Sequence, residues 1–138
     1  MSRRVNDERA EHAFEFIQGI SGVDKEKKEF RSLARSFPTM VQNNGLNVAV
    51  AFLLTKNSKD DEGKKKFNGH KMLHSRLAEW LKRRELINSE NLTKALIELK
   101  REEYRLVSQE VMEYASWIKR FAEGRWDKDG KEKSSSED

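Results

Sequence analysis

The amino-acid sequence predicts an all-α protein, a compact single-domain bundle of about six helices. Residues that favour helices are abundant, whereas the 138 residues include only 7 glycines and 1 proline. Apolar residues recur at steps of three and four through most of the chain, the period of a helix with one buried face. No segment alternates convincingly between apolar and polar residues, so we expect no β-strand. A chain of this length can bury one hydrophobic core without disulfides.

The first helix is expected to begin after Asn6, whose side chain can accept a hydrogen bond from the backbone and so cap it. Asp7 and Glu8 then lie in the first turn, where negative charge is favourable near the positive end of the helix dipole. Gly19 and Gly22 end the helix. The stripe expected to face the core consists of Ala10, Ala13, Phe14, Ile17 and Ile20.

The second and third helices meet at Asn43-Asn44-Gly45, residues that tolerate a left-handed backbone and predict a helix end. Asp24 can cap the second helix. Pro38 lies inside its pattern and either kinks a single helix or opens a new one, and the sequence leaves both alternatives open. The third helix, from about Leu46 to Thr55, is apolar on almost every side, which is typical of a buried helix. The core-facing residues of the second helix are Phe30, Leu33, Ala34, Phe37 and Val41.

Residues 56–69 show no apolar period, and we expect a mobile basic loop there. Its densest positive charge is the run of three lysines at 64–66, and its one apolar residue is Phe67. Asn68 can cap the fourth helix that follows. The fourth helix is expected to bury Leu73, Leu77, Trp80 and Leu81.

Two further helices are predicted after residue 88. Ser89 is expected to start a short fifth helix, and a loss of phase in the apolar stripe predicts a bend or break near residues 100–103. The sixth helix is the longest and its narrow stripe suits helix–helix packing. We assign residues 1–123 to one helical domain and expect residues 124–138 to form a polar, disordered tail. The core-facing residues are Leu92, Ala95, Leu96 and Leu99 in the fifth helix, then Tyr104, Val107, Val111, Tyr114, Ile118 and Phe121 in the sixth.

The positive charge of the chain is concentrated in one region. Residues 56–84 hold ten Lys or Arg against four Asp or Glu, a net charge of +6, while the whole chain has a net charge of +4. Such an asymmetry favours a polyanionic partner at one face. Lysines that only keep the protein soluble would give the same pattern, so both interpretations stay open at this point.

A row of cations at helical spacing can follow a phosphate backbone, because each phosphate that is neutralised adds to affinity by releasing counterions. Most aromatic residues fall on the predicted core stripes, so we expect contacts to the nucleic-acid backbone that are indifferent to sequence. The candidate RNA-binding residues are Lys64, Lys65, Lys66, Lys71, Arg76, Lys82, Arg83 and Arg84 in the loop and fourth helix, with Lys25, Lys28, Arg31 and Arg35 on the second helix.

Groups that could support catalysis are scarce. His70 and His74 are four residues apart, a spacing that can hold a metal, but no glutamate stands between them and no third ligand is evident. The sequence has no glycine-rich phosphate loop, and the absence of cysteine excludes thiolate chemistry and thiolate-ligated zinc. The acidic triplet at 60–62 lies in a lysine-rich loop and is interpreted as a solvated turn. We therefore predict no catalytic residue, no metal site and no cofactor.

Two other classes are also unfavourable. A helix-turn-helix protein would present the fifth helix to nucleic acid, but Glu90 and Glu98 on its outward face would be repelled by phosphates. The longest apolar run, Val48–Leu54, is far shorter than the roughly 20 residues that span a bilayer. The first residues include no apolar stretch typical of a secretory signal, so we expect a cytoplasmic protein without membrane contact.

Several segments, in order over residues 8–123, resemble the small subunit of the type III-B CRISPR effector, the Cmr complex. The longest is the central segment Leu33–Leu54, which includes Phe37-Pro38 and Asn44-Gly45-Leu46. The others are Arg9–Glu11 with Ala13, Leu77–Leu81, Tyr104–Arg105 and Trp117–Glu123. None of these segments is a catalytic signature.

The resemblance implies a non-catalytic subunit of an RNA-guided antiviral complex. Copies of such a subunit stack beside the guide-bearing subunits and help form the channel in which target RNA pairs with guide RNA, while other subunits cleave. The implied partners are the other effector subunits, further copies of the chain, and both RNAs through their backbones. Two alternatives remain: a helical protein–protein adaptor that touches no nucleic acid, and a metal-dependent enzyme that uses His70 and His74.

Overall fold

The computed structural model describes residues 4–55 and 67–133, and in these residues the secondary structure is helical apart from one isolated β-bridge between Trp126 and Glu132. The all-α prediction is therefore confirmed. The predicted basic loop lies mostly outside the described residues. The helices are α1 (Val5–Gly19), α2 (Asp24–Asn44), α3 (Leu46–Leu53), α4 (Gly69–Arg83), α5 (Leu92–Glu98) and α6 (Arg101–Arg125).

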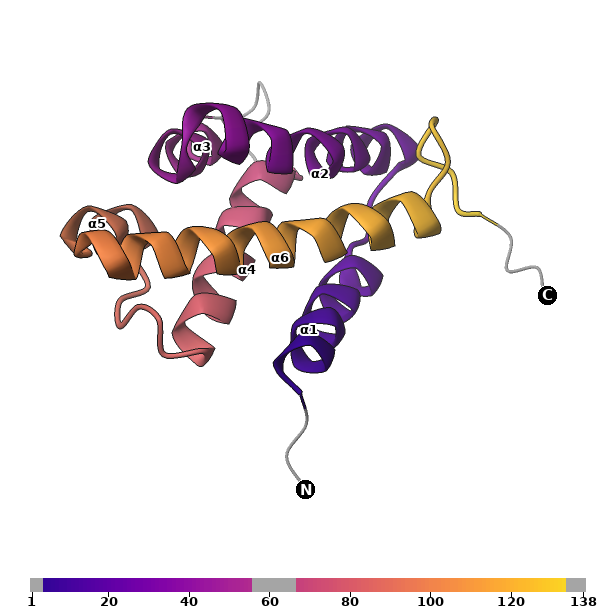
Figure 1. Ribbon diagram of the computed structural model, residues 1–138. Helices are drawn as coiled ribbons and strands as arrows, with labels where there is room; N and C mark the ends of the chain where they lie inside the picture. The colour runs from indigo at the N-terminus through magenta and orange to yellow at the C-terminus, as the bar shows by residue number, and fades with distance from the viewer. Residues whose placement is uncertain (1–3, 56–66, 134–138) are drawn as a thin grey trace.

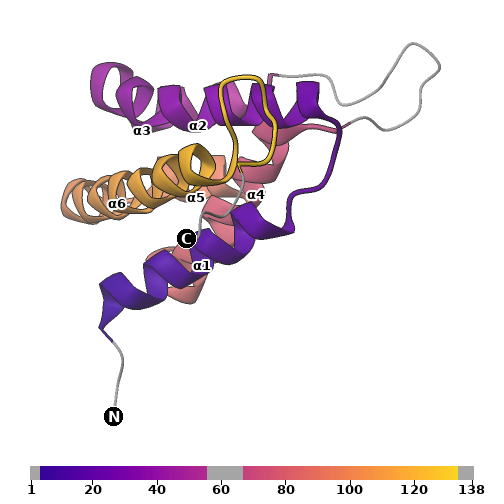
Figure 2. The same cartoon turned by 90° about the vertical axis from the view of Figure 1, so that its right-hand side faces the viewer.

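The helices are arranged in layers, one of α2 and α3, one that contains α6, and one of α1 (Figure 1). α4 crosses these layers. In Figure 2, α2 and α3 lie on one side of α6, and α1 lies on the other side. Besides crossing the layers, α4 makes contacts with four helices. It contacts α1, α2, α3 and α6. α3 and α5 pack together at the end of the molecule where α6 begins. Because α6 contacts α1, α2 and α4, its stripe of apolar residues forms the centre of the core.

The aromatic centre of the core joins α4 to α6. Trp80 and Tyr114 are fully buried, and their rings stack at a centroid distance of 5.9 Å with an interplanar angle of 14°. The stripe predicted for α4 is buried throughout, as is the stripe predicted for α2. In α6 the four central stripe residues are buried, whereas Tyr104 and Phe121 at its ends are half-buried. These stripes were predicted from spacing alone, and the structure confirms them.

The prediction for α1 needs two corrections. Phe14 is 46% exposed, and Phe16 is buried in its place. The inward face of α1 also carries Arg9 and His12, whose polarity hides the true stripe from a hydropathy pattern. Asn6 does not cap the helix, because the N-cap is Arg4.

The structure shows which of the two alternatives at Pro38 holds. α2 is one helix from Asp24 to Asn44, with Pro38 inside it. It ends at Gly45, whose φ of 89° lies in the region that favours glycine, as the sequence predicts. α3 ends at Leu53, about two residues before the predicted end.

Side-chain caps stand at the starts of α4 and α5, whereas the N-cap of α2 is Val23 and the expected cap by Asp24 is wrong. The Asn68 side chain accepts a hydrogen bond from the Lys71 backbone N–H at 3.0 Å, which confirms the predicted cap of α4. Asn91 rather than Ser89 caps α5, through the Lys94 backbone N–H. The predicted break near residues 100–103 is present just before that range, between the end of α5 and the start of α6.

The prediction of disorder from residue 124 is wrong for residues 124–133. α6 continues to Arg125, and residues 126–133, here called the C-terminal turn, pack against the bundle. Trp126 is fully buried, and its Nε1 donates to Glu132 at 3.0 Å. The Asp127 carboxylate accepts hydrogen bonds from the backbone N–H groups of Asp129 and Lys131. Composition did not reveal this turn because one buried tryptophan and one turn-forming aspartate hold it.

Gly130 of the C-terminal turn packs closely against the start of α2. Its φ is 81°, and a Cβ there would lie 2.1 Å from the Asp24 carbonyl oxygen and 2.6 Å from the Lys28 backbone nitrogen. Backbone atoms cannot move aside cheaply, so we expect Gly130→Ala to lower the free energy of unfolding by about 1–3 kcal/mol in urea titrations. Gly124→Ala is the matched control, since nothing lies within 4 Å of a Cβ there. Equal urea midpoints for the two variants would contradict this packing.

Candidate nucleic-acid interface

The candidate RNA-binding residues on α4 differ in their exposure and in their contacts with other residues of the chain. Lys71, Lys82 and Arg83 are exposed. Arg76 donates to Glu79 Oε1 at 3.0 Å and also lies over the Phe16 ring, 5.4 Å from its centroid. The Lys71 and Lys82 side chains are therefore the cations on α4 most available to phosphates.

The row of four cations predicted on α2 consists of two arginines that contact other parts of the chain and two exposed lysines. Arg31 Nε donates to the Trp126 carbonyl oxygen at 3.1 Å, and Arg35 forms an ion pair with Glu123 at 2.9 Å. Lys25 and Lys28 are exposed. The two arginines thus help to hold α6 and the C-terminal turn against α2, and the two lysines remain as outward charges.

Within the described part of the chain, the candidate cations do not form one patch. The start of α4 lies beside α2. Gly69 at this end of α4 is so close to α2 that an added Cβ would lie 2.7 Å from Cδ1 of the Phe30 ring. Lys82, Arg83 and Arg84 lie at the other end of α4, about 20 Å further along at 1.5 Å per residue. Lys64, Lys65 and Lys66 lie outside the described residues. The exposed cations therefore form separate groups along the molecule.

A buried ion pair that the sequence did not predict joins α1 to α6. Arg9 Nε and Nη2 donate to the two Glu110 oxygens at 2.5 and 2.9 Å, and Trp80 Nε1 donates to the same carboxylate at 2.8 Å. Burial alone would raise the pKa of the Glu110 carboxyl, but the hydrogen bonds from Arg9 and Trp80 outweigh it, so this pKa is below its ordinary value. Glu110 is therefore ionised and fully paired inside the fold.

His12 on α1 contacts side chains of both α4 and α6. Its Nε2 lies 2.7 Å from Glu79 Oε1, and its Nδ1 lies 2.7 Å from the Tyr114 hydroxyl. A carboxylate can only accept, so Nε2 carries the proton and Nδ1 of the neutral ring accepts from Tyr114. Burial lowers the pKa of His12, although Glu79 acts in the opposite direction. His12 is thus a neutral structural group in the core.

We expect the stability of the protein to fall as the pH drops from about 7 to about 5. Burial lowers the pKa of both His12 and His74, so the unfolded chain, with histidine pKa values near 6.5, takes up protons first. This stability is present above about pH 6.5 and is lost below it, at up to about 1.4 kcal/mol per pH unit for each histidine. Urea unfolding at several pH values measures the slope.

His12→Gln should reduce that slope and leave the contribution of His74, and the double variant with His74→Gln should reduce it further. The Glu79 and Glu110 carboxyls do not add to the slope in this range, because their pKa values are lowered. Their contribution is lost only as the pH falls below about 4.3. A wild-type slope of zero between pH 7 and pH 5 would contradict the assignment.

The two histidines with metal-binding spacing have other surroundings. The His70 ring packs edge-on against Phe52 at 5.3 Å, and His74 Nε2 is buried without a hydrogen-bond partner. Within residues 4–55 and 67–133, no group of three or more His, Cys, Asp or Glu is arranged to hold a metal ion. None of the helices in this part of the chain is long and apolar enough to cross a membrane.

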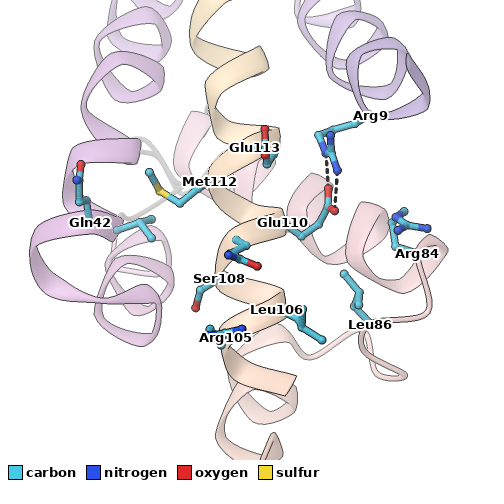
Figure 3. Close-up of a pocket in the computed structure, with 12 residues that line it drawn as sticks. Arg9, Gln42, Arg84, Leu86, Arg105, Leu106, Ser108, Glu110, Met112 and Glu113 are labelled. Atoms are coloured by element: carbon cyan, nitrogen blue, oxygen red, sulfur yellow. Dashed lines mark hydrogen bonds and ion pairs between the residues drawn. The ribbon is translucent and has the colours of Figure 1, made fainter. Parts of the chain in front are cut away.

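A pocket of about 960 Å³ extends over α6 between α1, the end of α2 and the chain after α4 (Figure 3). Arg9 and Glu110 form one wall, and Figure 3 shows their two hydrogen bonds. Leu86 and Leu106 line its apolar part, and Arg84 lines the pocket beside them. The pocket combines apolar surface with arginine side chains and contains no constellation typical of catalysis.

Comparison with known proteins identifies the family. Residues 5–125 match the family model described as CRISPR-associated protein (Cas_Cmr5). The CRISPR system Cmr subunit Cmr5 of Thermus thermophilus is 35% identical over 95 residues, which cover 69% of this chain and 73% of that protein. The crystal structure of a CRISPR-associated Cmr5 family protein from the same organism superposes with a TM-score of 0.64 at 27% identity, covering 88% of this chain and 96% of the other.

The family match spans the six helices described above, and the fold agrees with that of the solved relative. The chain belongs to the Cmr5 family, the small subunits of the type III-B CRISPR effector complex.

Proposed function

We propose that this chain is a non-catalytic subunit that stacks with copies of itself along the effector complex in the cytoplasm. There it helps form the basic channel that holds target RNA paired with guide RNA, and so serves antiviral defence. The family match over residues 5–125 is the observation that carries this proposal. The exposed lysines on α2 and α4 support the RNA contact, because they point outward from the bundle and are free to meet phosphates.

The surroundings of the ionisable groups in the core support a structural role. Arg9, Glu110 and His12 are buried, and each makes its strong hydrogen bonds to other side chains of the bundle. Groups used in this way stabilise the packing of α1, α4 and α6. Cleavage of RNA is therefore assigned to other subunits of the complex.

RNA recognition is proposed to be backbone-directed. Lysine is a flexible point charge that meets phosphates in many geometries and does not select a base. The half-exposed ring of Phe14 lies beside Glu11 and Glu15, so phosphates would be repelled from that surface. Binding through the lysines alone gives the tolerance of sequence that a channel for any guide–target pair needs.

The variant Lys71→Glu/Lys82→Glu is expected to weaken target binding by the assembled complex. Each lost phosphate contact should reduce the slope of log K against log salt concentration by about 0.7–0.9. Target affinity of complexes reconstituted with guide RNA, measured over a salt series, tests this expectation. Lys94→Glu is the matched control, because Lys94 is exposed on α5 between two glutamates.

A companion variant replaces Lys64, Lys65 and Lys66 with glutamate. Its target affinity tests separately whether residues 56–69 contribute to RNA binding. Incorporation of the chain into the complex with unchanged affinity for every variant would favour the adaptor function without RNA contact. Failure to join the complex in a pull-down would contradict the proposed function as a whole.

A further inference from the structure

The part of the Figure 3 pocket that lies between α6 and the chain after α4, here called the groove, has a defined chemistry. Its apolar surface comes from Leu86 and from Leu106, which is 53% exposed. Figure 3 shows Arg84 on one side of these leucines and Arg105 on the other. The Nε atom of Arg84 is buried and has no hydrogen-bond partner. The groove therefore suits an apolar side chain that is accompanied by a carboxylate.

The outer face of α1 presents such a group. Phe14 is 46% exposed, which is unusual for a phenylalanine in a helix that packs on two others. Its ring packs edge-on against Phe121 at 5.3 Å, and Phe121 stacks on Trp117 at 5.4 Å with an angle of 19°. Trp117 is fixed in turn by donating its Nε1–H to Asn6 at 3.2 Å. The Phe14 ring is thus held in place before any partner arrives.

The charges around Phe14 complement those of the groove. Glu11 and Glu15, three residues before and one residue after Phe14, are both exposed on α1. Aromatic residues that are braced and partly exposed are typical of the anchors of protein interfaces. We name Glu11, Phe14 and Glu15 the ridge. The aromatic ring with the Glu15 carboxylate beside it fits a socket of two leucines flanked by two arginines.

We propose that the ridge of one copy of this chain docks into the groove of a second copy. This inference rests on the proposed function, which includes the stacking of copies, and it names the two surfaces. A head-to-tail stack needs two different patches on each copy. The ridge and the groove share no residue, and Leu106 and Phe121 lie about 22 Å apart along α6.

The chemistry favours a protein rather than RNA at both surfaces. The carboxylates of the ridge repel phosphates. The pocket also contains Glu110 and Glu113, which balance part of its positive charge. A second copy supplies the Glu15 carboxylate for the arginines of the groove together with the apolar anchor, and RNA supplies no such anchor.

The test uses one variant for each surface in the reconstituted effector complex. The ridge variant is Phe14→Ala/Glu15→Arg, and the groove variant is Leu106→Ala/Arg105→Glu. All four residues are exposed, so both variants should fold, and their unfolding temperatures are measured before reconstitution. Native mass spectrometry counts the copies of the chain in each complex. We expect either variant alone to be held as a single copy, where the wild type is held as several.

The decisive sample is an equal mixture of the two variants. The intact groove of the ridge variant can accept the intact ridge of the groove variant, so complexes should contain two copies and never more. Val48→Ala, which truncates a side chain that is 56% exposed on α3, should leave the copy number at the wild-type value.

Three results would overturn the proposal, and each has a different meaning. Wild-type copy numbers for both variants would remove these surfaces from the stack while leaving the proposed function intact. An unchanged copy number with weaker target RNA binding by the groove variant would make the groove an RNA site. Failure of the wild-type chain to enter the complex would contradict the proposed function and this inference together.

Discussion

Replacing Arg9 with alanine is expected to lower the free energy of unfolding by about 3–5 kcal/mol. The Arg9 and Glu110 side chains are only 10% and 9% exposed, and the ion pair between them joins the first helix to the last. Removing the guanidinium leaves the Glu110 carboxylate buried with Trp80 as its remaining donor. A buried charge that has lost its partner is costly because it has also lost the water that would solvate it. Urea unfolding at pH 7 measures the change.

Two further variants separate this explanation from a general loss of contacts. Arg35→Ala removes an ion pair with Glu123 in which the Arg35 side chain is 56% exposed, and should cost less than about 1 kcal/mol. Arg9→Met/Glu110→Met removes both charges and should recover much of the stability lost in Arg9→Ala. A loss below about 1 kcal/mol for Arg9→Ala would show that the pair does not hold α1 to α6.

Replacing Trp126 with alanine is expected to cost about 3–5 kcal/mol, the range for a large aromatic residue removed from a core. Trp126 is fully buried, its ring packs edge-on against Phe30 at 6.1 Å, and the Arg125 guanidinium lies over it at 4.9 Å. The Arg125 side chain is the main cause that lowers the pKa of Glu132 to about 2, so the C-terminal turn is held by charge as well as by packing. Thermal and urea unfolding both report the loss.

Val48→Ala is the control for this second prediction, because Val48 is an exposed apolar residue and its truncation should change stability by less than about 0.5 kcal/mol. If Trp126→Ala were as mild as Val48→Ala, the C-terminal turn would contribute little to the fold. The original expectation of a disordered tail would then describe residues 126–133 better than the packed turn does.

The parts of the fold that could be predicted are those set by local spacing. The stripe of α2, from Phe30 to Val41, and the stripe of α4 follow a regular period with polar residues outside, so spacing alone places them in the core. Asn68 and Gly45 mark helix ends through their own backbone and side-chain preferences. These features depend on residues a few positions apart in sequence.

The parts that could not be predicted depend on partners far away in the chain. Arg9 and His12 are buried because Glu110 and Tyr114 lie opposite them, about one hundred residues later. A hydropathy pattern places such polar residues outside the core, which shifted the predicted stripe of α1 to Phe14. No local signal could have shown these pairs, because only the packing of α1 on α6 creates them.

For the candidate interface, too, the contacts with distant residues could not be read from the spacing. Arg31 and Arg35 have the spacing of a phosphate track, yet Trp126 and Glu123 of the C-terminal region meet them in the fold. The total charge of a segment indicates a polyanionic partner without showing which cations are already paired. Lys71 and Lys82 remain outward, and they carry the prediction of RNA contact.

The most direct test of the central claim is photo-crosslinking of target RNA in the assembled complex, followed by mapping of the crosslinked peptides of this chain. We expect crosslinks to α4 peptides that contain Lys71 or Lys82, at levels that fall as the salt concentration rises. We expect none to the α1 peptide that carries Phe14. Crosslinks confined to α1, or none anywhere on a chain that is fully incorporated, would contradict the central claim.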